Sequence, residues 1–78
     1  MTPVPSAVEK RSLVVGTAKT SISLEQPFWM EFRRMAHERD IPLSRLAAEI
    51  NAKPGANLSS KIRMTVLAEQ MKKARRRK

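Results

Sequence analysis

The alternation of residues 19–25 (KTSISLE), followed at once by Pro27 and two aromatic residues, most limits how this chain can fold. Successive side chains of an extended strand point to opposite sides. The face that can join a core carries Thr20, Ile22 and Leu24. The opposite face carries Lys19, Ser21 and Ser23. A lone strand cannot satisfy its own backbone hydrogen-bonding groups, so this strand needs a partner.

Two partners are available for the strand at residues 20–24. Residues 10–15 (KRSLVV) are rich in aliphatic and β-branched side chains and end at Gly16, which predicts a second strand and a hairpin. The other partner is the same strand of a second copy of the chain. A chain of 78 residues has a marginal core of its own, so self-association is expected to add buried surface. The two pairings do not exclude each other, and both stay open.

The first predicted helix covers residues 26 to 39. Pro27 suits its first turn, where a missing N–H costs nothing. The helix is expected to end near Asp40, because the residue before Pro42 is disfavoured in helical conformation. One apolar face follows helical spacing and carries Phe28, Phe32, Met35 and Ala36.

Two further helices are predicted. The second begins after Pro42 and ends by Lys53, ahead of a proline-glycine pair. Asn57 is a good N-cap for the third. The apolar stripe of the second helix is Leu43, Leu46, Ala47 and Ile50. The third helix carries two apolar rows, Leu58, Ile62 and Val66 in one and Met64, Leu67 and Met71 in the other. Two rows predict contact with two neighbours.

The net charge of +9 is unevenly distributed along the chain. Residues 72–78 (KKARRRK) hold six of the 16 basic residues, which leaves 10 basic against seven acidic residues elsewhere. We therefore predict an extended or disordered arm at 1–9, a folded domain at 10–71 and a flexible basic tail at 72–78. Each cation of the tail could neutralise a phosphate and release a counterion. A solvated end and attraction to anionic lipid are the alternatives.

The composition excludes several classes of site. There is no cysteine and only one histidine, so neither a disulfide nor a structural zinc cluster is expected. His37 and Asp40 lie close together in sequence without a glycine-rich phosphate loop or paired carboxylates, so we expect no enzyme and no cofactor. No apolar run is long enough for a membrane span or a signal peptide, and a cytoplasmic, nucleoid-associated protein is expected.

The order of elements and several short motifs resemble the ribbon-helix-helix superfamily of DNA-binding proteins. The resemblance covers residues 19–50 and rests on T-S-I-S-L, on P-F-W and F-x-x-M-A in the first helix, and on L-S-R-L-A in the second. A longer similarity includes K-R-S before the strand and N-L-S-S after the second helix, and it resembles a group of small bacterial proteins. Asp40 departs from the glycine that commonly ends the first helix in relatives.

The resemblance implies a mainly α fold with a short β ribbon, formed by an intertwined homodimer. An extra N-terminal strand and a third helix are additions to it. In that fold each chain gives one strand to an antiparallel ribbon that enters the major groove of double-stranded DNA. The implied base contacts are Lys19, Ser21 and Ser23. The implied phosphate contacts are Leu43, Ser44 and Arg45, to which the basic tail adds Lys72, Lys73, Arg75, Arg76 and Arg77. The expected dimer core is Ile22, Leu24, Phe28, Phe32, Met35, Leu46 and Ile50.

The width of the sheet raises a difficulty for this interpretation. Four strands at a spacing of about 4.8 Å would crowd a major groove roughly 12 Å wide. If residues 10–15 pair with the ribbon strand, either they lift away or the ribbon enters the groove differently from the simplest relatives. Trp29 could stack on a base, but beside Phe28 and Phe32 it is expected in the dimer core or at its rim.

The function predicted from these features is sequence-specific DNA binding, with repression of transcription as the implied role. One alternative is a dimeric protein-interaction module of the antitoxin kind, although the basic C-terminal segment is short for wrapping a toxin. A weaker alternative is a basic peptide that binds RNA or a membrane surface.

Overall fold

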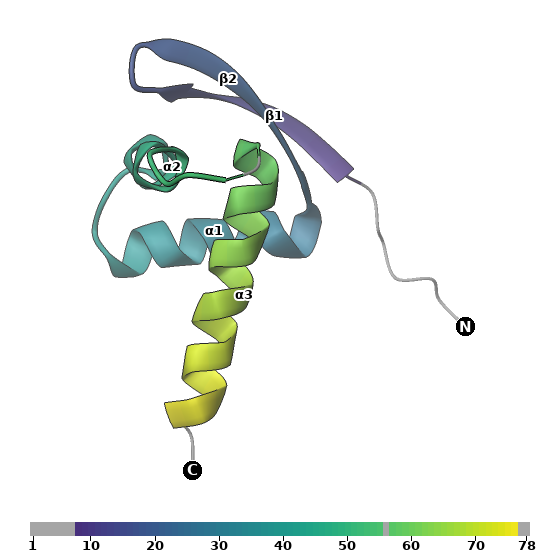
Figure 1. Cartoon of the computed structure of the whole chain (residues 1–78), viewed down its shortest axis with the longest axis vertical. Helices are drawn as coiled ribbons and strands as arrows, with labels where there is room; N and C mark the ends of the chain where they lie inside the picture. The colour runs from purple at the N-terminus through teal and green to yellow at the C-terminus, as the bar shows by residue number, and fades with distance from the viewer. Residues whose placement is uncertain (1–7, 56, 77–78) are drawn as a thin grey trace.

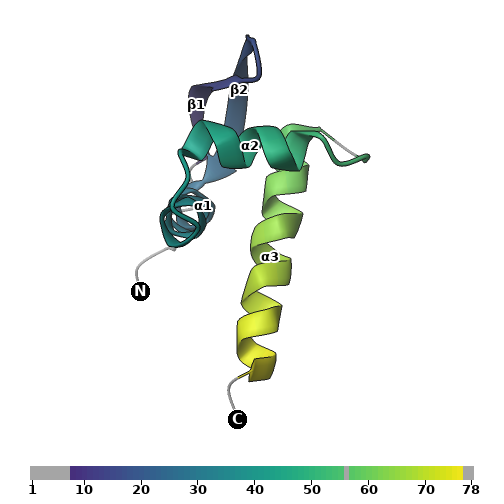
Figure 2. The same cartoon turned by 90° about the vertical axis from the view of Figure 1, so that its left-hand side faces the viewer.

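The computed structural model describes residues 8–55 and 57–76. Two strands precede three helices: β1 (Val8–Val15), β2 (Ala18–Glu25), α1 (Gln26–Glu38), α2 (Leu43–Asn51) and α3 (Leu58–Arg76). The strands form a hairpin that lies across one end of the helices, and α3 extends from it toward the opposite end (Figures 1 and 2). Two strands followed by three helices were predicted, and this order is confirmed; the hairpin is one of the two strand pairings that the sequence left open.

The two strands pair antiparallel over their full length. Val15 lies opposite Ala18 at the turn, and Val8 lies opposite Glu25 at the far end. Gly16 has a φ of +69°, which a residue without a Cβ adopts freely, so the two-residue turn closes without strain. Residues 10–15 thus do pair with the ribbon strand of their own chain.

Burial alternates along β2 as the sequence predicted. Ile22 and Leu24 are fully buried, whereas Lys19 and Ser21 are exposed. On β1, Val15 is buried beside them and Leu13 packs against the same core. One face of the hairpin therefore closes the core and the other faces solvent.

The turn after α1 uses a conformation that few residues tolerate. Asp40 has a φ of +58°, in the left-handed region that glycine occupies most easily. The N–H of Ile41 donates to the carbonyl oxygen of Ala36 at 3.0 Å, which closes the end of the helix. Pro42 then precedes α2, which begins at Leu43.

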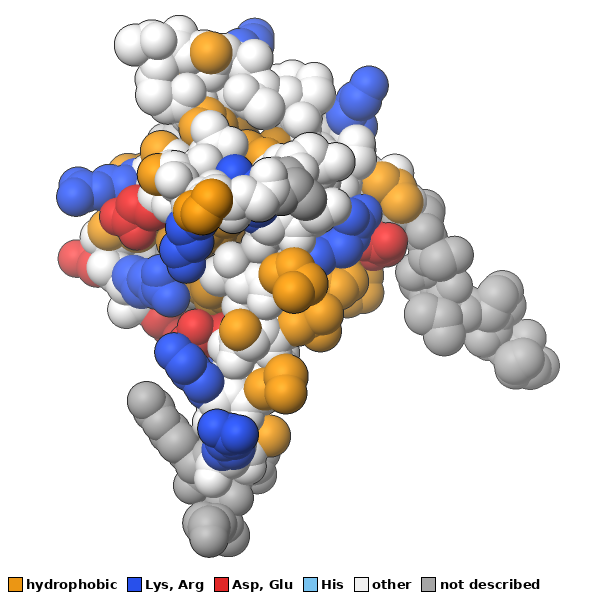
Figure 3. Space-filling view, viewed as in Figure 1, with side chains coloured by type: hydrophobic (Ala, Val, Ile, Leu, Met, Phe, Trp, Pro, Cys, Tyr) orange, Lys and Arg blue, Asp and Glu red, His pale blue; other side chains and the backbone are white. Residues whose placement is uncertain are grey.

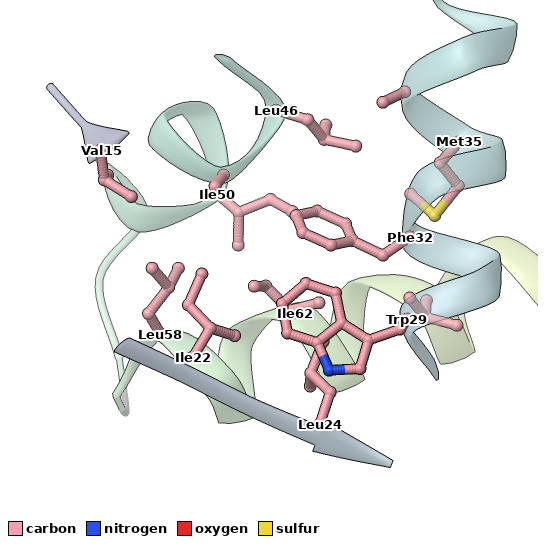
Figure 4. Close-up of a cluster of buried hydrophobic side chains, with 13 residues drawn as sticks. Val15, Ile22, Leu24, Trp29, Phe32, Met35, Leu46, Ile50, Leu58 and Ile62 are labelled. Carbon is pink, nitrogen blue, oxygen red and sulfur yellow. The ribbon is translucent and has the colours of Figure 1, made fainter. Parts of the chain in front are cut away.

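The cap predicted for α3 is present. The N–H of Ser60 donates a 2.9 Å hydrogen bond to Oδ1 of Asn57, so the first turn begins with a satisfied donor. The core lies between the hairpin and the three helices, and Figure 4 shows how side chains from all five elements meet. Its largest fully buried members are Trp29, Phe32, Ile22, Leu24, Met35, Leu46 and Ile62.

Two element boundaries differ from the predicted ranges. β1 begins at Val8, so the last two residues of the predicted arm at 1–9 are part of a strand; residues 1–7 lie outside the described residues. α3 continues to Arg76, so most of the predicted flexible tail at 72–78 is helical. The physical reason is propagation: adding a Lys, Arg or Ala residue to a formed helix costs little compared with starting one.

Only one of the two apolar rows of α3 packs within the chain. Leu58, Ile62 and Val66 are buried in the core. The other row is solvent-exposed, and Figure 3 shows hydrophobic side chains gathered along that side of the helix. Its members are Met64, Leu67 and Met71, which keep 68%, 49% and 65% of their surface exposed. The predicted second neighbour of this row stays a prediction.

Candidate nucleic-acid interface

The outward face of the hairpin carries side chains from both strands. Residues directly opposite one another in an antiparallel pair lie on the same side of the sheet. The pairs on the outward side are Lys10 with Ser23, Ser12 with Ser21, and Val14 with Lys19. We call these six residues the hairpin face. All are exposed except Ser23, which is half-buried.

The three predicted base-contact residues, Lys19, Ser21 and Ser23, therefore lie together on this face. Lys10 and Ser12 were missed by the sequence prediction. A two-residue turn at Gly16 would have assigned both, because the turn length fixes which residues of β1 oppose those of β2. The hairpin face offers ammonium donors and hydroxyl groups on a two-stranded ribbon, which is the width that the major groove admits.

The outer edge of β2, on the side away from β1, is held by α3. The N–H of Ser23 donates to Oγ of Ser59 at 3.0 Å, and Nη2 of Arg63 donates to the carbonyl oxygen of Ser23 at 3.3 Å. Backbone groups of alternate residues point to the same edge of a strand, so those of Lys19 and Ser21 also point outward. On this edge, the N–H and the carbonyl oxygen of Ser23 are therefore both satisfied by α3.

A salt bridge also joins α3 to the end of β2. Nε of Arg63 lies 2.9 Å from Oε1 of Glu25, the residue that precedes α1. The hydrogen bond from Arg63 holds the pKa of the Glu25 carboxyl below its usual value. Glu25 is at the end of the outward side of β2, and pairing with Arg63 offsets a negative charge that would repel DNA.

The first strand, β1, is held to α1 by Trp29. Its indole N–H donates a 2.9 Å hydrogen bond to the carbonyl oxygen of Glu9, and the guanidinium carbon of Arg11 lies 5.3 Å from the ring centroid. Trp29 keeps only 2% of its surface exposed, so it cannot serve as a stacking platform for a base. The structure places it in the core of one chain, where it anchors β1.

The predicted phosphate contacts at the start of α2 lie on the core side of the hairpin. Pro42 provides no side-chain cap, and within the described residues no hydrogen bond reaches the N–H of Leu43 or Ser44. Unpaired N–H groups at a helix start suit a phosphate. Arg45 is exposed, with Nε 3.6 Å from Oε2 of Glu49.

The basic end of α3 is not brought to the hairpin face. Fourteen residues of helix separate Ser59 from Lys73, which is about 21 Å at 1.5 Å per residue. The two views place this end opposite the hairpin (Figures 1 and 2). Lys72 and Arg75 are exposed there, while Nζ of Lys73 lies 3.6 Å from Oε2 of Glu38. The side chain of Arg76 and all of Arg77 lie outside the described residues, and the phosphate role of this segment stays a prediction.

The residues predicted for a dimer core pack inside a single chain. Phe28 is partly buried against the core, and the other six are buried in it. Those six are Ile22, Leu24, Phe32, Met35, Leu46 and Ile50. A contact between two chains through these residues stays a prediction.

Comparison with known proteins places this arrangement in a family. The family model of the ribbon-helix-helix domain matches residues 8–70, which is most of the chain. The chain belongs to the ribbon-helix-helix domain family. Members of this family generally bind DNA, usually as dimers. The superfamily resemblance is therefore confirmed.

One solved structure has a similar fold. It is an uncharacterized protein from Bordetella pertussis Tohama I, which is 26% identical and superposes with a TM-score of 0.81. The superposition covers 95% of the present chain and 64% of the Bordetella protein. A comparison with curated protein sequences gives no match. Among residues 8–55 and 57–76, which the structure describes, no helix is long and apolar enough to cross a bilayer.

Proposed function

We propose that this protein binds double-stranded DNA by placing the hairpin face in the major groove. The observation that carries the proposal is the arrangement of Lys19 and Ser21 on an exposed two-stranded ribbon whose other face is closed by the core. A ribbon supported in this way is rigid, because Ile22 and Leu24 are locked between the helices. Lysine can donate to guanine O6 and N7, and serine can donate or accept.

The finer part of the proposal concerns sequence and regulation. Lys19 carries the larger share of base discrimination, because the contacts of serine hydroxyls are short and permissive. A good base contact is worth about 1 to 3 kcal/mol. The N–H groups of Leu43 and Ser44 are proposed to hold a phosphate and to set the register of the ribbon in the groove. Repression of transcription is the proposed biological role, and two chains are proposed to act together as a dimer.

The test compares genomic DNA fragments with random DNA of equal length. Lys19→Ala is expected to reduce the preference for the selected fragments by about tenfold. Lys72→Ala is the matched control, because it removes the same charge from the far end of α3. Equal effects of the two substitutions would show that charge alone drives binding and would overturn base reading by the hairpin face.

A second function is favoured by one specific observation, the exposed row Met64, Leu67 and Met71 on α3. A row of apolar side chains along a helix suits a protein partner. An interaction module of the antitoxin kind would use this row while the hairpin face stays free. Its signature would be a small protein that co-purifies with the chain and is lost on Leu67→Glu.

A further inference from the structure

The end of α3 that lies away from the hairpin carries a second group of basic side chains, which the hairpin face does not use. Lys72 and Arg75 are exposed there, and Figure 3 shows Lys and Arg side chains along the lower half of the helix. Within residues 8–55 and 57–76, neither of these two side chains forms an ion pair. Both charges are therefore presented to solvent.

A hollow of about 350 Å³ beside this part of α3 collects basic side chains from three segments. Arg39 follows α1, Lys53 follows α2, and Lys72 belongs to α3. All three are exposed. The carboxylate in the lining belongs to Glu69, whose Oε1 lies 3.5 Å from Nη2 of Arg39. We call Arg39, Lys53, Lys72 and Arg75 the α3 basic surface.

The far part of the α3 basic surface is too distant from the hairpin face to share its ligand. Lys72 lies about 20 Å along α3 from Ser59, which is bonded to β2, at 1.5 Å per residue. The two views place this end of the helix opposite the hairpin (Figures 1 and 2). The separation exceeds the Debye length of about 8 Å at physiological salt. An anionic partner of this end of α3 is therefore a second molecule.

The chemical class of this partner follows from charge and position. A second copy of the chain would bring an identical basic surface, and like charges repel. A bilayer would also have to contact the exposed apolar row of α3. Leu67 and Lys72 are five residues apart, which is about 140° around a helix of 3.6 residues per turn, so one flat surface does not reach both. A nucleic-acid duplex carries about one negative charge per 1.7 Å of its axis and can meet several cations with several phosphates.

We propose that the α3 basic surface holds the phosphate backbone of a second nucleic-acid duplex, so that one molecule joins two duplexes. The inference rests on the proposed function, in which the hairpin face holds the first duplex. Phosphate contacts carry no sequence information by themselves. The second duplex is therefore bound without regard to its sequence, and its binding weakens as the salt concentration rises.

A capture experiment tests the inference. A selected genomic fragment is fixed to beads, loaded with fewer chains than it has sites and washed, and a labelled duplex of random sequence is then added. Loaded beads are expected to retain the labelled duplex, whereas beads without protein are not. Lys72→Gln/Arg75→Gln should reduce this capture by about tenfold or more, while loading onto the selected fragment stays within about twofold. Capture equal to that of the wild type would overturn the inference.

A variant that keeps the charge is the matched control. Lys72→Arg/Arg75→Lys exchanges the two side chains, so capture should stay within about twofold of the wild type. A folded exchange variant that captures as little as the glutamine variant would overturn phosphate attraction. The dependence of capture on salt gives a second measurement, since removing two contacts should lower the slope of log K against log salt by about 1.8.

The same beads separate failure of the inference from failure of the proposed function. If the wild-type chain is not retained on the selected fragment, the proposed function and the inference both fail. If it is retained but captures no labelled duplex, the inference alone fails. Vesicles of phosphatidylserine and phosphatidylcholine in equal parts are added in a parallel sample. Retention of these vesicles without retention of the duplex would assign the α3 basic surface to lipid and overturn the inference.

Discussion

The backbone N–H of Ser23 donates a 3.0 Å hydrogen bond to the hydroxyl oxygen of Ser59, which joins the edge of β2 to the first turn of α3. This contact links residues 36 positions apart in sequence. It fixes the hairpin relative to the longest helix, and it fills one place on the strand edge where a second copy could pair.

Removing this contact is expected to destabilise the fold. Ser59→Ala leaves the N–H of Ser23 without its acceptor in a partly buried place, so the free energy of unfolding should fall by about 1 kcal/mol. Ser60→Ala is the matched control, because replacing serine by alanine raises the helix propensity of α3 equally at both positions. Within the described residues, the hydroxyl of Ser60 makes no hydrogen bond. Urea denaturation measures both variants, and equal stability of the two would contradict the role of Ser59.

The pair of Glu25 and Arg63 predicts a pH dependence of stability. The hydrogen bond from Arg63 lowers the pKa of Glu25 in the folded protein from its ordinary value of 4.5. The stabilisation is therefore fully present above that value, and it is lost as the pH falls through the lowered folded pKa. Glu25→Gln should be less stable than the wild type at about pH 6, and the difference should shrink toward about pH 3.

Thermal unfolding at several pH values checks this prediction. Glu49→Gln is a suitable control, since Glu49 forms an exposed pair with Arg45 whose atoms are 3.6 Å apart. Exposed pairs of this kind contribute little to stability. A constant gap between Glu25→Gln and the wild type across the acid range would argue against the proposed coupling.

Trp29→Phe should loosen the attachment of β1. Phenylalanine keeps the aromatic packing but cannot donate to the carbonyl oxygen of Glu9, so we expect a loss of about 1 to 3 kcal/mol. Met30→Leu, at the adjacent exposed position, should change stability by less than about 0.5 kcal/mol. Urea denaturation followed by far-UV circular dichroism compares them, because the tryptophan signal is absent in the first variant. Equal midpoints would mean that the indole hydrogen bond does not hold the strand.

Two basic clusters of equal charge should differ in their effect on DNA binding. Lys10→Gln/Lys19→Gln and Lys72→Gln/Arg75→Gln each remove two cations, so the net charge of the two variants is identical. The hairpin variant should lose both affinity and fragment preference. The α3 variant should lose less, because its cations lie about 20 Å along the helix from the hairpin, beyond the Debye length of about 8 Å at physiological salt.

Binding titrations over a range of salt concentrations measure this difference. Each phosphate contact that is lost reduces the slope of log K against log salt by about 0.9. If the α3 variant loses as much slope and affinity as the hairpin variant, the basic end of α3 reaches the same duplex. The separation of the two clusters in the structure would then not describe the complex.

Local signals in the sequence predicted the elements well. Gly16, Pro27 and Asn57 act within a few residues, and each marks a turn or a helix start where the structure has one. The alternation along β2 likewise predicted which side chains are buried. The helical end of α3 was missed, because composition alone does not show that a helix already formed upstream will continue through a run of basic residues.

Contacts between distant segments could not be predicted in the same way. Periodicity shows that a face is buried, but it does not show which segment covers it. The hydrogen bonds from Ser23 to Ser59 and from Trp29 to Glu9 depend on how the hairpin sits on the helices. Lys10 and Ser12 are a different case, because the two-residue turn at Gly16 would have placed them on the hairpin face once β1 was paired with β2.

The sequence by itself determined the strand and helix types, the buried side of β2 and the ribbon-helix-helix family. Each of these follows from spacing, turn residues or motifs that act over short distances along the chain. Only the tertiary structure decided that β2 takes β1 as its partner and that α3 closes part of its other edge. The physical reason is that strand edges are chemically alike, so their occupants are chosen by packing of the whole core and not by the strand residues themselves.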